Sequence, residues 1–314
     1  MRVLVAGATG AIGAWLVPQL IERGHVVIGT LRTAQRADRL QRLGAEPLVL
    51  DVLDADAVQK AVLLARPDAI VHQATALSGK DDLKHFDRKF EKTNLLRTRG
   101  TDAIVAAAKH AGVRRIIAQS YTGWPYAREG GPIKTEDDRL DPRPVPAMRS
   151  SFEAIVHLER AVVDAGGVAL RYGGLYGTRD DPQLDLIRKR QLPVVGDGGG
   201  IWSFVHFEDA ASATVLALER DVTGIYNIVD DEPAKVRDWL PALAAAIGAK
   251  PPYHVPRWLA QIIAGEAGVL LMTEARGASN AKAKRELGWK LHYPSWREGF
   301  AASYGDAQIK AKSA

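Results

Sequence analysis

The chain has 314 residues, 46% of them hydrophobic, and its 42 Lys and Arg against 37 Asp and Glu give a formal net charge of +5. A globular chain of this length buries a large core without help from disulfides or metals. It contains no cysteine, which excludes thiol catalysis, thiolate metal sites and a disulfide scaffold.

The sequence predicts a cytoplasmic protein without a membrane or nucleic-acid partner. The first predicted strand begins at Arg2 and leaves no room for a signal peptide. The most apolar stretch, 258–272, is too short to cross a bilayer and contains Glu266. Most basic residues are dispersed and lack the interleaved aromatic residues that stack on bases, so we expect no nucleic-acid binding.

The first half of the chain alternates short apolar runs with segments of helical period. Strands are predicted over 2–6, 26–30, 46–50, 68–72, 114–119 and 168–172. Helices are predicted between them over 11–23, 35–43, 54–65, 86–110 and 149–165. This alternation predicts an α/β fold with a Rossmann-type, doubly wound parallel sheet, which binds its ligands at the carboxyl ends of the strands.

The second half has short strands, prolines and separate helices, and predicts a smaller C-terminal α+β domain that binds the substrate. Its helices are expected over 208–219, 235–247, 256–272, 280–287 and 295–305. We expect a dinucleotide-binding domain over 1–175, to which 204–230 returns, and a substrate domain over 176–203 and 231–314. The run 126–146 is rich in glycine and proline without periodicity, and predicts a lid.

A glycine-rich turn directly follows the first predicted strand and opens the first predicted helix. A glycine at residue 7 permits a tight turn, one at 10 lets the backbone approach phosphate, and one at 13 allows close packing of helix on strand. The free N–H groups at the start of the helix favour an anion. The turn therefore predicts a dinucleotide site whose residues are Gly7, Thr9, Gly10, Ala11, Ile12 and Gly13.

The second predicted strand favours NADP(H) as the cofactor. It ends without the acidic residue that binds the ribose 2′-hydroxyl of NAD, and Arg32 and Arg36 follow it. The arginine fork matches a phosphate group, although both residues could equally be a solvated face at the start of a helix. Asp51 and Val52, after the third strand, are placed to contact the adenine, or Asp51 is only the polar start of the next helix.

Short motifs in a characteristic order resemble the extended short-chain dehydrogenase/reductase family, which includes NAD-dependent epimerases and dehydratases. They lie at 7–13, 70–74, Asn94 with Gly100 and Thr101, 170–177, 204–211, 286–289 and 296–299. The resemblance implies a small-molecule substrate and a homodimer formed through helices 86–110 and 149–165. It also implies cofactor contacts from Gln73, Ala74, Thr75, Asn94, Tyr172, Gly173, Gly174 and Leu175.

The chain departs from that family at its Tyr-x-x-x-Lys motif, so it resembles an atypical branch. The family has a Tyr proton donor, a Lys four residues later that lowers the pKa of the phenol, and a Glu four residues after the Lys. Glu159 matches that Glu, which places Ile155 at the Lys and Ser151 at the Tyr.

Three hydroxyl groups remain as catalytic candidates. Ser120 matches the family's serine at the end of the fifth strand, where it can polarise a carbonyl group. Tyr121 beside it is the candidate for a displaced proton donor, or else an amphipathic wall residue. Ser151 could hold a water or a substrate oxygen but is a poor acid. No metal site is expected, because His72 and His206 lie in strand segments without an acidic ligand pair.

These features predict an atypical NADP(H)-dependent oxidoreductase that acts on a carbonyl or hydroxyl group of a small organic substrate. Two alternatives stay open. One is an epimerase or dehydratase on a nucleotide-sugar-like substrate with transient use of the cofactor. The other is a non-catalytic NADP(H)-binding sensor or scaffold, because the family's Tyr and Lys are missing.

Overall fold

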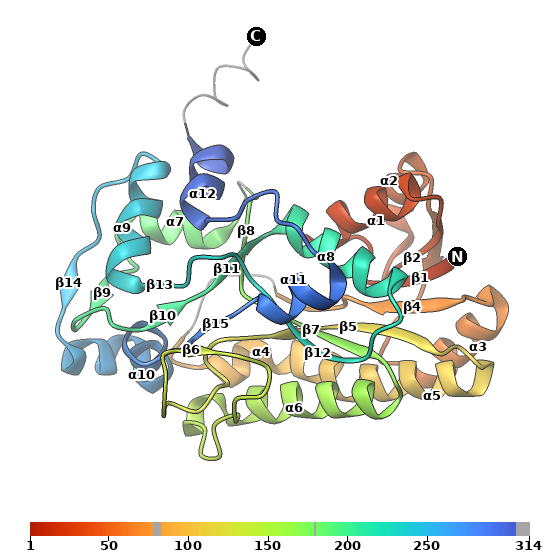
Figure 1. Ribbon diagram of the computed structural model, residues 1–314, viewed down its shortest axis with the longest axis horizontal. Coiled ribbons are helices and arrows are strands. Elements are labelled where there is room, and N and C mark those ends of the chain that lie inside the picture. Colours follow the sequence, from red (N-terminus) through yellow and green to blue (C-terminus); the bar gives the residue numbers. More distant parts are fainter. Residues whose placement is uncertain (78–82, 179, 306–314) are drawn as a thin grey trace, which may run out of the picture.

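The computed structural model describes residues 1–77, 83–178 and 180–305 (Figure 1). Within these ranges, one parallel sheet has the strand order β12-β7-β5-β4-β1-β2-β3. Its strands are β1 (Arg2–Ala6), β2 (Val26–Leu31), β3 (Glu46–Val49), β4 (Ala69–His72), β5 (Arg115–Tyr121), β7 (Val168–Tyr172) and β12 (Gly224–Ile228). The order reverses between β1 and β4, which confirms the doubly wound fold and places its ligand crevice at the carboxyl ends of these two strands.

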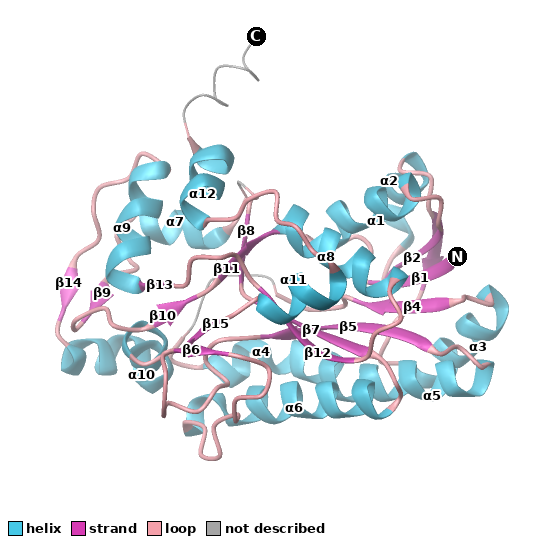
Figure 2. Ribbon diagram, in the orientation of Figure 1, coloured by secondary structure: helices cyan, strands magenta, loops and turns pink. Residues whose placement is uncertain are grey.

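Helices cover both faces of the sheet (Figure 2). One face carries α1 (Gly13–Glu22), α2 (Ala37–Arg42), α8 (Phe207–Glu219) and α11 (Ala281–Leu287). The other carries α3 (Ala55–Ala65), α4 (Phe86–Leu95), α5 (Thr101–Ala111) and α6 (Arg149–Asp164). The alternation of strand side chains explains both layers: Val3 and Val5 pack under α1 and α8, whereas Leu4 and Ala6 pack on α3, α5 and α6.

A smaller part of the chain has a second core around Phe204, Trp239, Trp296 and Phe300. It lies beside one end of the sheet in Figure 1. Its helices are α7 (Pro182–Arg188), α9 (Val236–Ala246), α10 (Arg257–Thr273) and α12 (Trp296–Tyr304). Its strands are β8 (Gly174–Tyr176), β9 (Val194–Val195), β10 (Ile201–Trp202), β11 (Phe204–His206), β13 (Ala234–Lys235) and β14 (His254–Val255). The smaller part therefore forms a separate apolar body next to the carboxyl end of β7, from which β8 follows directly.

The structure differs from the sequence prediction at three places. The predicted helix 86–110 is divided by a π-helical turn, η2 (Leu96–Gly100), between α4 and α5. Strand β12 is not among the predicted strands, because it starts with Gly224 and contains Asn227, and both residue types are depleted in strands. The predicted lid 126–146 is fixed to the C-terminal part, because its strand β6 (Ile133–Lys134) pairs with β15 (Gly277–Ala278). Short 3₁₀ turns, η1 (Ala34–Arg36) and η3 (Pro146–Met148), precede α2 and α6.

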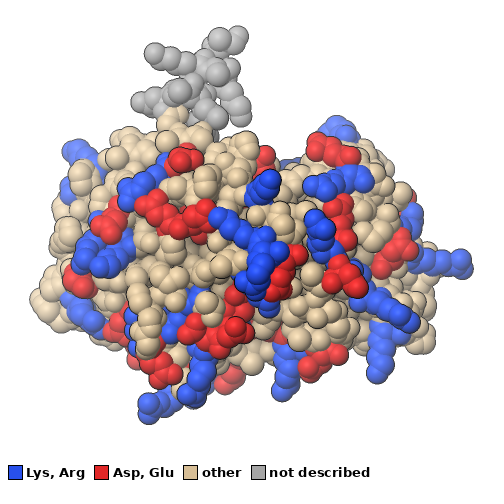
Figure 3. Space-filling view, viewed as in Figure 1, with Lys and Arg blue, Asp and Glu red and all other residues tan. Residues whose placement is uncertain are grey.

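The face of the molecule that Figure 3 displays has no continuous basic patch. Blue and red side chains are interspersed over that face. Among the described residues, no helix combines the length and apolar character that crossing a bilayer requires. The most apolar candidate, α10, bends at Gly265, whose φ is 69°.

Candidate functional site

The glycine turn between β1 and α1 forms a cradle that side chains would fill. Gly7 has a φ of 87°, and a Cβ there would lie 2.7 Å from the carbonyl oxygen of Gln73. A Cβ on Gly13 would lie 2.3 Å from the carbonyl oxygen of Ala8. No side chain caps the first turn of α1, and among the described residues no acceptor is found for the N–H groups of Ala11, Ile12 and Gly13, which are therefore open to an anion. These residues therefore fit the pyrophosphate of a dinucleotide.

The end of β2 presents an exposed cationic surface next to this cradle. Arg32 and Arg36 are both exposed, and neither forms an ion pair or hydrogen bond with any described residue. The buried Thr30 accepts a hydrogen bond from the backbone N–H of Gly7 at 3.3 Å, which ties β2 to the glycine turn. Asp51 accepts from the N–H of Leu53 at 3.0 Å, so it also shapes its own turn.

The residues predicted after β4 and β7 meet in the interior. The amide of Gln73 donates to the phenol oxygen of Tyr172 at 3.0 Å, and that oxygen lies 2.6 Å from the hydroxyl of Thr214. Burial raises the pKa of Tyr172 to about 12, which makes it a poor acid near neutral pH. A Cβ on Gly173 would lie 2.4 Å from the carbonyl oxygen of Ser203, so glycine is required where β7 passes into β8.

His72 ends β4 and is neutral. Burial lowers its pKa to about 4, and its Nε2 lies 3.2 Å from the carbonyl oxygen of Leu96. Among the described residues there is no group of three His, Cys, Asp or Glu that could hold a metal ion. His206 likewise has its pKa lowered to about 4 by burial, so both histidines fit internal, uncharged roles.

Ser120 belongs to a buried charge network on the α6 side of the sheet. Its hydroxyl donates to Glu159 at 2.6 Å. Arg171 donates to both oxygens of the same carboxylate at 2.7 and 2.6 Å, and to the phenol oxygen of Tyr126 at 2.9 Å. Because its proton is engaged by a buried carboxylate, Ser120 contributes to holding β5, β7 and α6 together.

Ser151 and Asn94 contact each other rather than the glycine turn. The Ser151 hydroxyl is fully buried, donates to Asp87 at 2.6 Å and accepts from the Asn94 amide at 3.0 Å. This arrangement links the start of α6 to α4 and satisfies the hydroxyl. Ile155, at the position of the family's Lys, is buried in an apolar cluster. Helix α6 therefore presents neither an acid nor a cation at these two positions.

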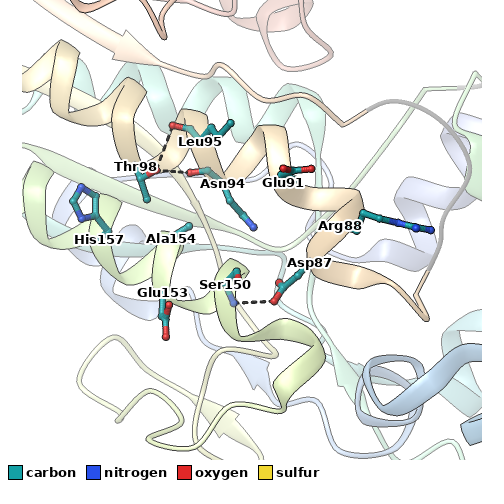
Figure 4. Close-up of a pocket in the computed structure, with 10 residues that line it drawn as sticks. All are labelled: Asp87, Arg88, Glu91, Asn94, Leu95, Thr98, Ser150, Glu153, Ala154 and His157. Atoms are coloured by element: carbon teal, nitrogen blue, oxygen red, sulfur yellow. Dashed lines mark hydrogen bonds between the residues drawn. The ribbon is translucent and has the colours of Figure 1, made fainter.

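The outer faces of α4 and α6 form a groove of about 580 Å³ (Figure 4). Its lining includes Glu91 and Asn94 from α4, Thr98 from η2, and Glu153 and His157 from α6. Its lining includes no residue of the glycine turn, so it is separate from the cofactor cradle. The homodimer expected through these helices stays a prediction.

Tyr121 ends β5 and is half-buried against an aromatic-rich cluster. The cluster includes Phe86, Trp124, Met148, Ile155, Ala267, Leu270 and Leu271. Tyr121, Trp124 and Trp202 border a small cavity of about 20 Å³. The structure thus separates the two neighbouring candidates: Ser120 bonds to Glu159, whereas Tyr121 packs where β5, α6 and α10 meet.

Arg97 on η2 is the residue that sequence reasoning missed. It is only 7% exposed, and burial lowers the pKa of its guanidinium to about 10 against the opposing charges of Tyr121 and Glu159. The residue types around it gave no signal, because an arginine in a helix is ordinarily exposed, and only the folded chain shows it buried on one face with Thr93 and Gly100.

The sequence is similar to a protein family and to several characterised enzymes. Residues 3–229 match the model of the NAD dependent epimerase/dehydratase family. A 3-diazoavenalumate denitrifying reductase from a Streptomyces species is 43% identical, with 95% of this chain and 99% of that protein covered. A UDP-glucose 4-epimerase from Mycolicibacterium smegmatis is 28% identical, with 92% and 93% covered.

Solved structures agree with this assignment. The UDP-glucose 4-epimerase of Thermus thermophilus in complex with NAD matches with a TM-score of 0.72 and 25% identity, covering 97% of this chain and 98% of that one. The chain is an NAD(P)-dependent enzyme of the oxidoreductase or epimerase type. It belongs to the NAD dependent epimerase/dehydratase family, among the extended short-chain dehydrogenases/reductases.

Proposed function

We propose that this protein is an NADP(H)-dependent reductase that replaces the diazo group of a small organic compound with hydrogen and releases N₂. One observation carries the proposal. At the two positions where α6 would supply an acid and a cation, it has Ser151, whose hydroxyl is already bonded to Asp87 and Asn94, and the buried Ile155.

The chemistry of a diazo substrate explains how such a site can work. Reduction of a carbonyl group creates an alkoxide, which needs a proton donor. In a diazonium compound, the hydride ends on the carbon atom that carries the N₂⁺ group, and that group leaves as N₂. R–N₂⁺ and H⁻ therefore give R–H and N₂, and no oxygen needs a proton. The reduced nicotinamide, when bound, supplies the hydride. The relative at 43% identity is a denitrifying reductase of a diazo compound, which supports this substrate class.

The side chains beside the end of β5 suit a flat, conjugated substrate. Tyr121, Trp124 and Trp202 surround the small cavity there, and the Trp202 indole N–H is occupied by the carbonyl oxygen of Leu271 at 2.8 Å. These rings therefore offer apolar surfaces for an aromatic substrate. Because a cavity of about 20 Å³ has room for no more than a water molecule, the rings must move apart when such a substrate binds.

A second candidate is reduction of a carbonyl group with the Tyr121 phenol as proton donor. The observation that favours it is the buried cation Arg97, whose pKa an ionised Tyr121 would raise. A cation beside a phenol stabilises the phenolate that remains after proton transfer.

One assay separates these candidates. Purified protein receives NADPH deuterated at C4 with either benzenediazonium or acetophenone, and the rate without protein is subtracted. We expect enzymatic NADPH loss to equal N₂ release, with deuterium in the benzene product. Tyr121→Phe is expected to lower kcat/KM by less than about fivefold on the diazonium compound.

Two other outcomes would contradict the proposal. Turnover of the ketone alone, lost by 10²-fold or more in Tyr121→Phe, assigns the phenol as the general acid. If the protein binds NADPH but turns over neither of these compounds nor UDP-glucose, the result favours a non-catalytic NADP(H)-binding sensor.

We further propose that Arg32 and Arg36 select NADP(H) over NAD(H). Arg32→Ala is expected to raise the Kd of NADPH by roughly 10- to 100-fold and to leave the Kd of NADH unchanged, because a charged hydrogen bond to phosphate is lost. Fluorescence titration measures both constants. Arg42→Ala, an exposed residue on the nearby α2, is the matched control and should alter neither constant. Equal weakening of both cofactors by Arg32→Ala would reject the selection.

A further inference from the structure

Arg97 is a buried cation whose hydrogen-bond donors have no acceptor among the described residues. It is 7% exposed, and within residues 1–77, 83–178 and 180–305 its guanidinium forms no hydrogen bond or ion pair. A guanidinium has five N–H donors and stays charged in proteins. Burying it without a partner is costly, so its presence needs an explanation.

The carboxylate that acts on Arg97, Glu159, already has other partners. Glu159 accepts two hydrogen bonds from Arg171 and one from Ser120. Arg171 and Glu159 form an ion pair with 4% of each side chain exposed, so Arg97 leaves this buried group with one uncompensated positive charge. His72, which also lies close to Arg97, is neutral and adds no compensating charge.

The place of Arg97 in the fold indicates what it meets. The carbonyl of its neighbour Leu96 lies 3.2 Å from Nε2 of His72, at the end of β4, and an ionised Tyr121, at the end of β5, would raise the pKa of the guanidinium. A dinucleotide bound at a switch point places its adenosine half over β1, β2 and β3. Its nicotinamide half would then lie over the ends of β4 and β5, where His72 and Tyr121 stand.

We propose that Arg97 is the positioning residue for the nicotinamide half of the cofactor, donating hydrogen bonds to the hydroxyl oxygens of its ribose. The family's lysine position, on α6 one helical turn before Glu159, is Ile155 in this chain. The cation of the site would therefore come from the π-helical turn η2 instead. This inference rests on the proposed use of a nicotinamide dinucleotide, but not on the identity of the substrate.

The test compares the whole cofactor with its adenosine half. Fluorescence and calorimetric titration measure the Kd of NADPH and of 2′,5′-ADP for the wild-type protein, Arg97→Met and Arg97→Lys. We expect Arg97→Met to weaken NADPH roughly 10- to 100-fold and 2′,5′-ADP less than twofold. Arg97→Lys, which keeps the charge, should recover NADPH binding to within about fivefold of wild type. NADH and ADP provide the same comparison if the adenosine site prefers an unphosphorylated ribose.

Thermal unfolding without cofactor separates this role from a structural one. Because Arg97→Met removes an uncompensated buried charge, its Tm should equal or exceed that of wild type. Arg99→Met, an exposed arginine on the same turn, is the matched control and should change neither Kd. Unchanged NADPH binding in Arg97→Met overturns the proposal, and so does equal weakening of NADPH and 2′,5′-ADP. Failure to reduce a diazo compound would leave these binding results intact.

Discussion

Replacing Glu159 with Leu is expected to lower the free energy of unfolding by roughly 3–5 kcal/mol, because the buried guanidinium of Arg171 then has no opposite charge beside it. Arg171 donates to both oxygens of this carboxylate, and only 4% of each side chain is exposed. Ser120 also loses its acceptor. Denaturant-induced unfolding, followed by circular dichroism, measures the change.

The double variant Glu159→Leu/Arg171→Met is the matched control. Replacing both charges with apolar side chains of similar size should recover most of the lost stability, since buried ion pairs add little over well-packed hydrophobic groups. It also yields a result if the single variant does not fold. A single variant as stable as wild type would show that the pair is accessible to water.

Gly13→Ala is expected to weaken dinucleotide binding by about 100-fold or more. Its Cβ would lie 2.3 Å from the carbonyl oxygen of Ala8 and 2.8 Å from that of Gly7. The start of α1 must therefore move away from the turn that holds the pyrophosphate, and a displacement of about 1 Å already misplaces bound groups. The Kd of NADPH from fluorescence titration reports the loss, and overpacking should also lower stability by roughly 1–3 kcal/mol.

Gly131→Ala is the control for this glycine. It lies on the exposed loop before β6, where an added Cβ meets no atom within 4 Å among the described residues. Neither NADPH binding nor stability should change. Wild-type affinity in Gly13→Ala would show that the turn does not hold the pyrophosphate.

Local patterns sufficed for six of the seven strands of the sheet and for the glycine turn. Strands such as Arg2–Ala6 and Val168–Tyr172 are short, mostly apolar runs that end at a glycine, a pattern that can be read from neighbouring residues alone. The glycine turn was equally visible, because its spacing has one structural use after a strand and before a helix. The division of 86–110 by η2 was missed, because a π-helical turn keeps the apolar pattern of a continuous helix.

The roles of the polar side chains near the cofactor needed the folded chain. The sequence alone determined that the Tyr and Lys of the family are absent at Ser151 and Ile155. Only the tertiary structure showed that the Ser151 hydroxyl is held by Asp87, 64 residues away, and that Ser120 is held by Glu159, 39 residues away. The tertiary structure also showed that Arg97 is buried and that its N–H groups have no hydrogen-bond acceptor among the described residues. Periodicity reports which face of an element is buried, whereas a hydrogen-bond partner depends on segments that meet only when the chain folds.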